Sequence, residues 1–337
     1  LTISHSLFPT HLKEKTLRNA FSIALIQAAQ ADERVILLTG DHGYSLFDEF
    51  RRLCPPRQYI NAGVAEQNMV GVAAGLAKAG LRPVVYGLSA FVPMRVLEQI
   101  KLDVCYERLP VVFMGDGAGI VYTTLGASHQ CTEDIAALRA LPNLAILSPA
   151  DAWEMSACMD LALHADGPVY VRMGKADLES VHGRRPELTW GNPLLLRDGY
   201  GPLGWIATGS MTPTAVRLSS RWPGSAVWSV PCLKPMHELP ISRICERHRA
   251  LVCLEEHSVH GGLGSAVAEL ATSHMPVPIC RVGIRDRFSR ACGSYAFLLA
   301  EHGLDDESIV RQVQNFVDSL PEQSWNSNRR STFRLVA

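Results

Sequence analysis

The sequence contains no long hydrophobic segment. Its apolar runs are far shorter than the roughly 20 residues of a transmembrane helix, and its N-terminus lacks the basic and then apolar pattern of a signal peptide. An excess of charge is missing as well, because 32 Lys and Arg residues balance 33 Asp and Glu residues. A near-neutral chain creates no field that attracts nucleic acid or an anionic membrane. We therefore expect a cytoplasmic protein that binds neither.

Cysteine pairs and low-complexity segments are also absent. The nine cysteines are scattered along the chain, and no two of them have the C-x-x-C spacing. This pattern argues against a zinc knuckle and against a disulfide framework. We predict that the cysteines are small, buried hydrophobic residues.

What is present is an alternation of short apolar runs with stretches of helical periodicity. The strand-like runs are 35–38, 83–86, 110–114, 144–147, 168–172, 205–208, 226–230, 251–254 and 278–282. Strands that alternate with helices are typical of a parallel sheet covered on both faces. A length of 337 residues is sufficient for two such domains.

The predicted fold class is therefore α/β with two domains, each a mostly parallel sheet flanked by helices. We place the first α/β domain at 12–178 and a second, smaller one at 201–320. Residues 179–200 between them are polar and loop-like, which suits a linker. The polar tail at 321–337 is predicted to be flexible.

Glu66 is the most informative single residue, because it precedes an apolar helix predicted at 66–79. A carboxylate in the first turn of a helix is stabilised by the free backbone N–H groups there. Many such residues only cap the helix, whereas a buried one that faces a ligand is a functional group. Gly71 and Gly75 share one face of this helix, and their missing side chains let another backbone approach closely. We predict a tight helix contact at that face.

Ligands of open parallel sheets lie beyond the carboxyl ends of the strands. The positions that follow the predicted strands are Asp41, Glu66, Phe91, Gly115 to Gly119, His129 and Arg172. We expect these positions to form one site.

Three motifs occur in order along the chain. They are GVAEQNM at 63–69, GASHQCTEDIAALRALPN at 126–143, and EEHS at 255–258 followed by GGLGS at 261–265. Together they resemble the thiamine-diphosphate enzymes of the transketolase family. More specifically, the chain resembles the C-terminal polypeptide of a split transketolase, which carries the pyrimidine-binding domain and the C-terminal domain.

The resemblance implies roles for the candidate residues. Glu66 would hydrogen-bond the far ring nitrogen of the cofactor's aminopyrimidine and favour its imino form, a bond that a dry site strengthens. Phe91 would stack on the pyrimidine ring, unless it is a core residue, and Asp41 and Gln67 would also lie at the cofactor. His129 would hydrogen-bond the oxygens of the substrate, although a lone loop histidine often has only a structural role.

Two arginines match family positions that grip a substrate phosphate. Arg172 lies at a predicted strand end and Arg18 at a helix start, where an arginine is otherwise simply solvated. Two other family contacts are missing: an Asp is replaced by Leu125 and a phosphate-contacting His by Gly117. Because an ordinary sugar phosphate would leave polar groups underpaired there, we expect a specialised donor or acceptor.

The resemblance excludes the diphosphate-binding domain, which in this family carries a metal-binding Gly-Asp-Gly motif and a downstream Asn. The run 115–117 with Asn143 imitates that motif, but it lies inside the pyrimidine-binding region. His257 and His260 imitate a metal pair in a run that matches the family's domain interface. The resemblance therefore places the diphosphate and Mg²⁺ on an α-type partner subunit, and no metal ligand in this chain.

These observations lead to one hypothesis and two alternatives. The hypothesis is a β-type subunit of a two-component, thiamine-diphosphate-dependent transketolase-like enzyme that moves a two-carbon ketol unit to an aldehyde, ketone or carrier. It would be inactive alone and would form an α₂β₂ heterotetramer with the Gly71 and Gly75 helix at a twofold contact. The alternatives are the β subunit of a 2-oxo acid dehydrogenase, which passes an acyl group to a lipoyl domain, and a non-catalytic assembly subunit.

Overall fold

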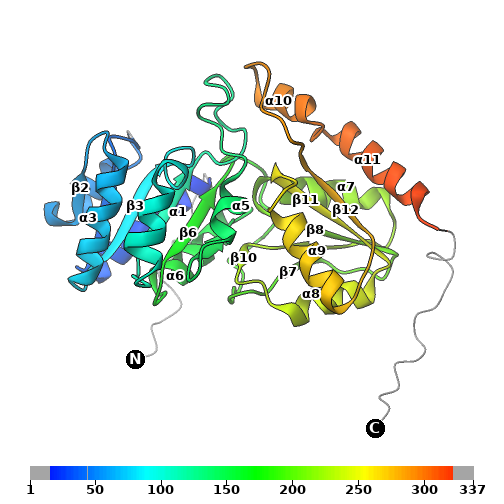
Figure 1. Ribbon diagram of the computed structural model, residues 1–337, viewed down its shortest axis with the longest axis horizontal. Helices are drawn as coiled ribbons and strands as arrows, with labels where there is room; N and C mark the ends of the chain where they lie inside the picture. The colour runs from blue at the N-terminus through cyan, green and yellow to red at the C-terminus, as the bar shows by residue number, and fades with distance from the viewer. Residues whose placement is uncertain (1–15, 44, 322–337) are drawn as a thin grey trace, which may run out of the picture.

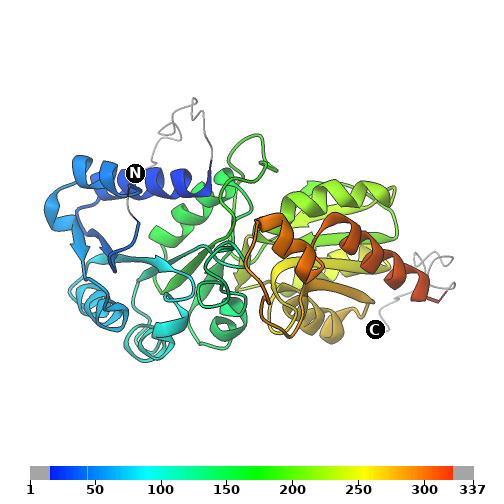
Figure 2. The same cartoon turned by 90° about the horizontal axis from the view of Figure 1, so that it is seen from above.

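The structure, a computed structural model, describes residues 16–43 and 45–321 and contains two sheets that lie side by side along the long axis (Figure 1). The first sheet has seven strands in the order β10-β5-β6-β4-β3-β1-β2, and the second has five in the order β12-β11-β8-β9-β7. Helices cover both faces of each sheet (Figure 2). The predicted α/β class with two mostly parallel sheets is confirmed.

The first domain is built on parallel strands. Its strands are β1 (Val35–Thr39), β2 (Tyr59–Asn61), β3 (Arg82–Leu88), β4 (Val112–Asp116), β5 (Ala145–Leu147) and β6 (Val169–Met173). All residues of β1, β4 and β6 are buried. These strands are continuous apolar runs because helices cover both of their faces.

Short helices connect these strands. They are α1 (Leu17–Ala31), α2 (Asp48–Leu53), α3 (Glu66–Lys78), α4 (Leu97–Gln99), α5 (Asp134–Arg139) and α6 (Ala152–Leu163). The Oγ1 of Thr16 accepts the N–H of Asn19 at the start of α1, and Asp151 accepts two N–H groups at the start of α6. Such N-terminal caps satisfy backbone donors that the helix leaves free.

The second domain has strands β7 (Leu194–Arg197), β8 (Leu203–Ala207), β9 (Ala226–Ser229), β11 (Ala250–Ser258) and β12 (Ile279–Ile284). Its helices are α7 (Thr212–Leu218), α8 (Glu238–Arg247), α9 (Leu263–His274), α10 (Tyr295–His302) and α11 (Asp306–Ser319). One apolar core joins α3 and α5 of the first domain to α8 and α9 of the second. The domains therefore pack as a continuous body.

Two strands depart from the predicted domain plan. The segment 179–200 is not a loop throughout, because β7 lies within it and pairs antiparallel with β9. The strand β10 (Cys232–Lys234) comes from the second domain's part of the chain but pairs antiparallel with β5 of the first sheet. Polar flanking residues hid β7, and pairing between distant segments has no local signal.

Other predictions meet the structure unevenly. Cys280 is half-buried and Cys292 is exposed, whereas the remaining cysteines are buried, and all are free. The proposed tail at 321–337 lies outside the described residues except for Pro321, as do residues 12–15 of the predicted first domain. Within the described ranges, no helix has both the length and the apolarity needed to cross a membrane.

Candidate functional site

Glu66 is the first residue of α3, as predicted, and only 4% of its side chain is exposed. Its Oε1 accepts a hydrogen bond from Nη1 of Arg95 at 3.0 Å. The Nε2 atom of His42 lies 3.9 Å from the same oxygen. The free N–H groups of the first helical turn add a positive partial charge beside the carboxylate. Glu66 is thus held in a nearly dry position at the end of the sheet.

Aromatic rings gather beside this carboxylate. The ring centroid of Phe91 lies 5.8 Å from that of His42 and 5.4 Å from that of His129. The Cζ atom of Arg95 lies 4.1 Å from the centroid of Phe91. We call these five residues, Glu66, His42, Phe91, Arg95 and His129, the Glu66 cluster. The structure therefore brings together the three residues that the motifs connect with the pyrimidine and the substrate.

His42 and Arg95 were missed by the sequence analysis. Thr39 and His42 exchange two hydrogen bonds through the Thr39 Oγ1, which fixes the backbone at the end of β1. The His42 Nε2 is buried and has no hydrogen-bond partner among the described residues. The strand-end rule that selected Asp41 applies equally to the next residue and could have found His42. No local signal marks Arg95.

Asp41 and Gln67, the other predicted cofactor residues, lie at the rim of the cluster. Asp41 adopts a φ of 62°, and it exchanges hydrogen bonds of 3.1 and 3.3 Å with the side chain of Asn61. Gln67 is exposed on the first turn of α3. Each is the chain neighbour of a cluster member, so both lie next to the place where a ligand would contact Glu66.

His129 lies on a loop that is closed at its base. Gly119 and Cys131 exchange backbone hydrogen bonds of 2.7 and 2.9 Å, which bring the two ends of the loop together. The Nδ1 of His129 and the Oγ of Ser128 lie 3.0 Å apart. The next residue, Gln130, accepts a hydrogen bond from the Oγ of Ser289 at 2.7 Å. The second domain therefore supports the loop that carries His129.

Arg18 lies near this loop and is held by a buried carboxylate. Its Nη2 donates to Oδ2 of Asp116 at 2.7 Å, and Tyr86 donates its hydroxyl to the same oxygen at 2.7 Å. Arg18 is 45% exposed, so part of its guanidinium faces solvent. Burial and the Asp116 carboxylate raise the pKa of Tyr86, which keeps the hydroxyl protonated as a donor. Asp116 thus orients Arg18.

The same contacts explain why the Gly-Asp-Gly run at 115–117 does not act as a metal motif. Asp116 is engaged by Arg18 and Tyr86. Asn143, its apparent counterpart, donates instead to the carbonyl oxygen of Cys105 at 2.9 Å. The two side chains have separate partners and share no common point.

Arg172 requires a correction. It is only 2% exposed, and its Nε donates to Asp134 at 2.9 and 3.1 Å while its Nη2 donates to the carbonyl oxygen of Glu256 at 2.9 Å. A guanidinium enclosed in this way holds the interior together and does not face a substrate phosphate. The strand end was predicted correctly, but the loop of His129 and the second domain cover it.

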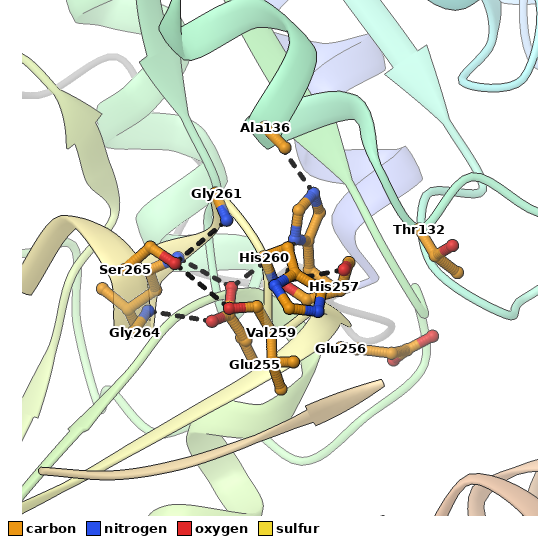
Figure 3. Close-up of polar contacts among 12 residues, drawn as sticks. Thr132, Ala136, Glu255, Glu256, His257, Val259, His260, Gly261, Gly264 and Ser265 are labelled. Atoms are coloured by element: carbon orange, nitrogen blue, oxygen red, sulfur yellow. Dashed lines mark hydrogen bonds and ion pairs between the residues drawn. The ribbon is translucent and has the colours of Figure 1, made fainter. Parts of the chain in front are cut away.

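The Glu255 to Ser258 run lies at the boundary between the domains (Figure 3). Glu255 accepts the N–H groups of Leu263 and Gly264, at 2.7 and 2.8 Å, at the start of α9. His257 donates from Nδ1 to the carbonyl of Ser258 at 2.8 Å, and its Nε2 accepts the N–H of Ala136 at 3.4 Å. Burial lowers the pKa of His257 to about 4, so the ring is neutral and joins α5 to β11.

Comparisons with known proteins agree over nearly the whole chain. The family models "Transketolase, pyrimidine binding domain" and "Transketolase, C-terminal domain" match residues 13–180 and 205–309. This chain belongs to the transketolase family. It has the two domains of the C-terminal half of a split transketolase, and it is a β-type transketolase subunit, as the motifs predicted.

Individual relatives of the family match along nearly their full length. The 6-deoxy-6-sulfo-D-fructose transketolase subunit SqwH of Clostridium sp. (strain MSTE9) is 36% identical over 316 residues, which cover 92% of this chain and 97% of the relative. A subunit of the apulose-4-phosphate transketolase of Phocaeicola vulgatus is 33% identical over 306 residues, or 89% and 97%. A solved structure described as "Split gene transketolase, inactive beta4 tetramer" has a TM-score of 0.82 and 32% identity, with 90% and 99% covered.

The structure also accounts for one departure from the family pattern. Gly117 has a φ of 72°, and a Cβ atom there would overlap the ring of Tyr122. The Tyr122 ring in turn lies 6.4 Å from that of His129. A phenol therefore occupies the space into which a family histidine at 117 would extend. Leu125, at the other departure, is exposed on the same loop.

Proposed function

We propose that this chain supplies the pyrimidine-binding half of an active site shared with an α-type subunit, and that the complete enzyme transfers a two-carbon ketol unit. The observation that carries this proposal is the buried Glu66 at the start of α3, placed beside Phe91 and His129. Membership in the transketolase family implies a transferase that depends on thiamine diphosphate.

The Glu66 cluster fits an aminopyrimidine ring. It offers a flat aromatic surface in Phe91, a buried carboxylate acceptor in Glu66, and a ring nitrogen of His42 to which no described residue hydrogen-bonds. When bound, thiamine diphosphate supplies the carbon nucleophile and the electron sink for ketol transfer. Glu66 would accept a hydrogen bond from the ring, and its low exposure keeps competing water away, which strengthens that bond.

His129 and Arg18 are proposed to hold the substrate. Ser128 engages the Nδ1 of His129, so the Nε2 is available to hydrogen-bond a carbonyl or hydroxyl oxygen. Arg18, positioned by Asp116, has an exposed part that can bind an anionic group. The relatives described above are named for a sulfonated and a phosphorylated sugar. We therefore propose a donor with an anionic end, which a panel of phosphorylated and sulfonated ketoses tests.

A partner subunit is proposed to bind the diphosphate and Mg²⁺. This chain spans only the pyrimidine-binding and C-terminal domains, and Asp116 of the Gly-Asp-Gly run is occupied by Arg18 and Tyr86. Gly71 and Gly75 are exposed on α3, and no atom of the described residues lies within 4 Å of a Cβ built on either. This face is open to a helix of another subunit, in keeping with an α₂β₂ assembly in the cytoplasm. The solved tetramer of β subunits is described as inactive, which supports dependence on a partner.

The test is co-purification with a candidate α subunit, followed by calorimetric titration of thiamine diphosphate and Mg²⁺ into each chain and into the mixture. We expect tight binding only in the mixture. Glu66→Ala should weaken it strongly, whereas Glu49→Ala, an exposed acid on α2, should leave it unchanged. Full binding by this chain alone, or a Glu66→Ala complex with normal affinity, would contradict the proposal. Ketol transfer without lipoyl-dependent turnover separates it from a 2-oxo acid dehydrogenase.

A further inference from the structure

Arg95 makes the two contacts that the Glu66 cluster offers to a pyrimidine ring. Its guanidinium carbon lies 4.1 Å from the centroid of Phe91, and its Nη1 donates to Oε1 of Glu66 at 3.0 Å. A guanidinium is flat and delocalised, and it carries N–H donors along its edge. An aminopyrimidine has the same features. A ring that stacks on Phe91 and donates to Glu66 would therefore compete with Arg95 for the same partners.

The surroundings of Arg95 suit a side chain that leaves. Arg95 is 45% exposed, whereas Glu66 is 4% exposed, so the guanidinium reaches the carboxylate from the solvent side. It belongs to the short 3₁₀ turn Met94–Val96, and its own N–H donates to the carbonyl of Phe91 at 3.2 Å. Half-exposed ion pairs and cation–π contacts are weak. Rotation of the side chain alone would free both partners.

Without Arg95, Glu66 would be poorly partnered in the absence of a ligand. In the described part of the chain, the other side-chain nitrogen near this carboxylate is Nε2 of His42, at 3.9 Å, which is too long for a hydrogen bond. Burying a carboxylate that lacks partners is costly. Arg95 therefore stabilises the cofactor-free chain, and the same interactions must be given up when a ring binds.

We propose that Arg95 is a placeholder for the pyrimidine ring. It is a positioning residue that holds Glu66 and Phe91 in their places in the cofactor-free protein and moves out when the cofactor binds. This inference rests on the proposed function, because it takes the Glu66 cluster to be the pyrimidine site. It predicts that removing Arg95 destabilises the free chain and yet tightens cofactor binding, since the competing state is lost.

The experiment uses the reconstituted complex and titrates thiamine diphosphate with Mg²⁺ by calorimetry, next to thermal unfolding of the free chain. Arg95→Ala should lower the Tm of the free chain and lower the Kd for the cofactor roughly fivefold. Arg95→Lys keeps the charge but loses the flat stacking group, so its Kd should fall by less. Arg57→Ala removes an exposed arginine paired with Glu33 and serves as the matched control.

Each outcome has a clear meaning. A weaker or unchanged cofactor affinity in Arg95→Ala overturns the placeholder role, because Arg95 would then contact the bound cofactor or play only a structural part. If Glu66→Ala weakens binding while Arg95→Ala does not tighten it, only the placeholder fails. If Glu66→Ala also has no effect, the proposed function fails. Should Arg95→Ala not fold, Arg95→Lys decides by the same comparison.

Discussion

Arg172 and Asp134 form a fully buried ion pair between β6 and α5, with Nε 2.9 Å from Oδ2. Tyr170 donates its hydroxyl to the same Oδ2 at 2.7 Å, and Arg172 also donates to the carbonyl of Glu256 in the second domain. One interior arginine thus joins the strand, the helix and the neighbouring domain. The pair is a structural element of the domain boundary, close behind the loop of His129.

The first prediction concerns this pair. Arg172→Leu should lower the free energy of unfolding by about 3–5 kcal/mol, because it leaves the Asp134 carboxylate buried without a countercharge. Chemical denaturation measures the change, and Arg57→Leu on the surface is the control. The double variant Arg172→Leu with Asp134→Leu should be less destabilised than the sum of the single variants. A loss within that of the control would show that the pair contributes little.

The second prediction concerns pH. The pKa of His257 is lowered to about 4 in the folded chain, against 6.5 when unfolded. As the pH falls from 6.5 toward 4, the unfolded state binds a proton that the folded state does not, so stability is lost. His257→Gln should reduce this loss in denaturation curves measured across the same range. An unchanged slope would mean that His257 is not the responsible group.

Glu255 should show the opposite sign. Burial raises its pKa to about 7 in the folded chain, from 4.5. Its stabilising contribution is therefore present below about pH 4.5 and is lost as the pH rises through 7. Glu255→Gln should gain stability relative to the original chain between about pH 5 and pH 8. A variant that falls behind over that interval would show that the Glu255 side chain is ionised and held by the N–H groups of α9.

The third prediction concerns the space over Gly117. Gly117→Ala would introduce a Cβ atom that overlaps the ring of Tyr122 and would displace that ring. Gly80 also has a positive φ, of 89°, but no atom of the described residues lies within 4 Å of a Cβ placed there. Gly80→Ala should therefore cost only the backbone strain, about 1 kcal/mol. Gly117→Ala should cost more and should also raise the KM for the donor in the reconstituted enzyme. Equal effects of the two variants would show that Tyr122 adapts freely.

The fourth prediction separates substrate binding from cofactor binding. His129→Ala in the reconstituted complex should lower kcat/KM by about a hundredfold, since it removes a hydrogen-bonding group from the substrate. The affinity for thiamine diphosphate should change little. His164→Ala, an exposed histidine at the end of α6, is the control. If His129→Ala abolishes cofactor binding instead, the ring acts mainly on the placement of Phe91.

The sequence by itself determined the features that depend on neighbouring residues. The apolar runs of β1, β4 and β6 are buried on both faces, and this leaves a local pattern that can be read directly. The start of α3 at Glu66 follows from helical spacing and from the first-turn carboxylate. The motifs around Glu66, His129 and Glu255 identified the family because they occur in a fixed order along the chain.

Only the tertiary structure decided which side chains meet. Arg172 looked like a site residue because it ends a strand, yet the second domain and Asp134 enclose it. Arg95 carries no local signal, but folding places it between Phe91 and Glu66. The strand β10 joins the sheet of the other domain. In each case the deciding energy comes from burial and charge pairing between distant segments, and the spacing of residues within one segment contains no record of it.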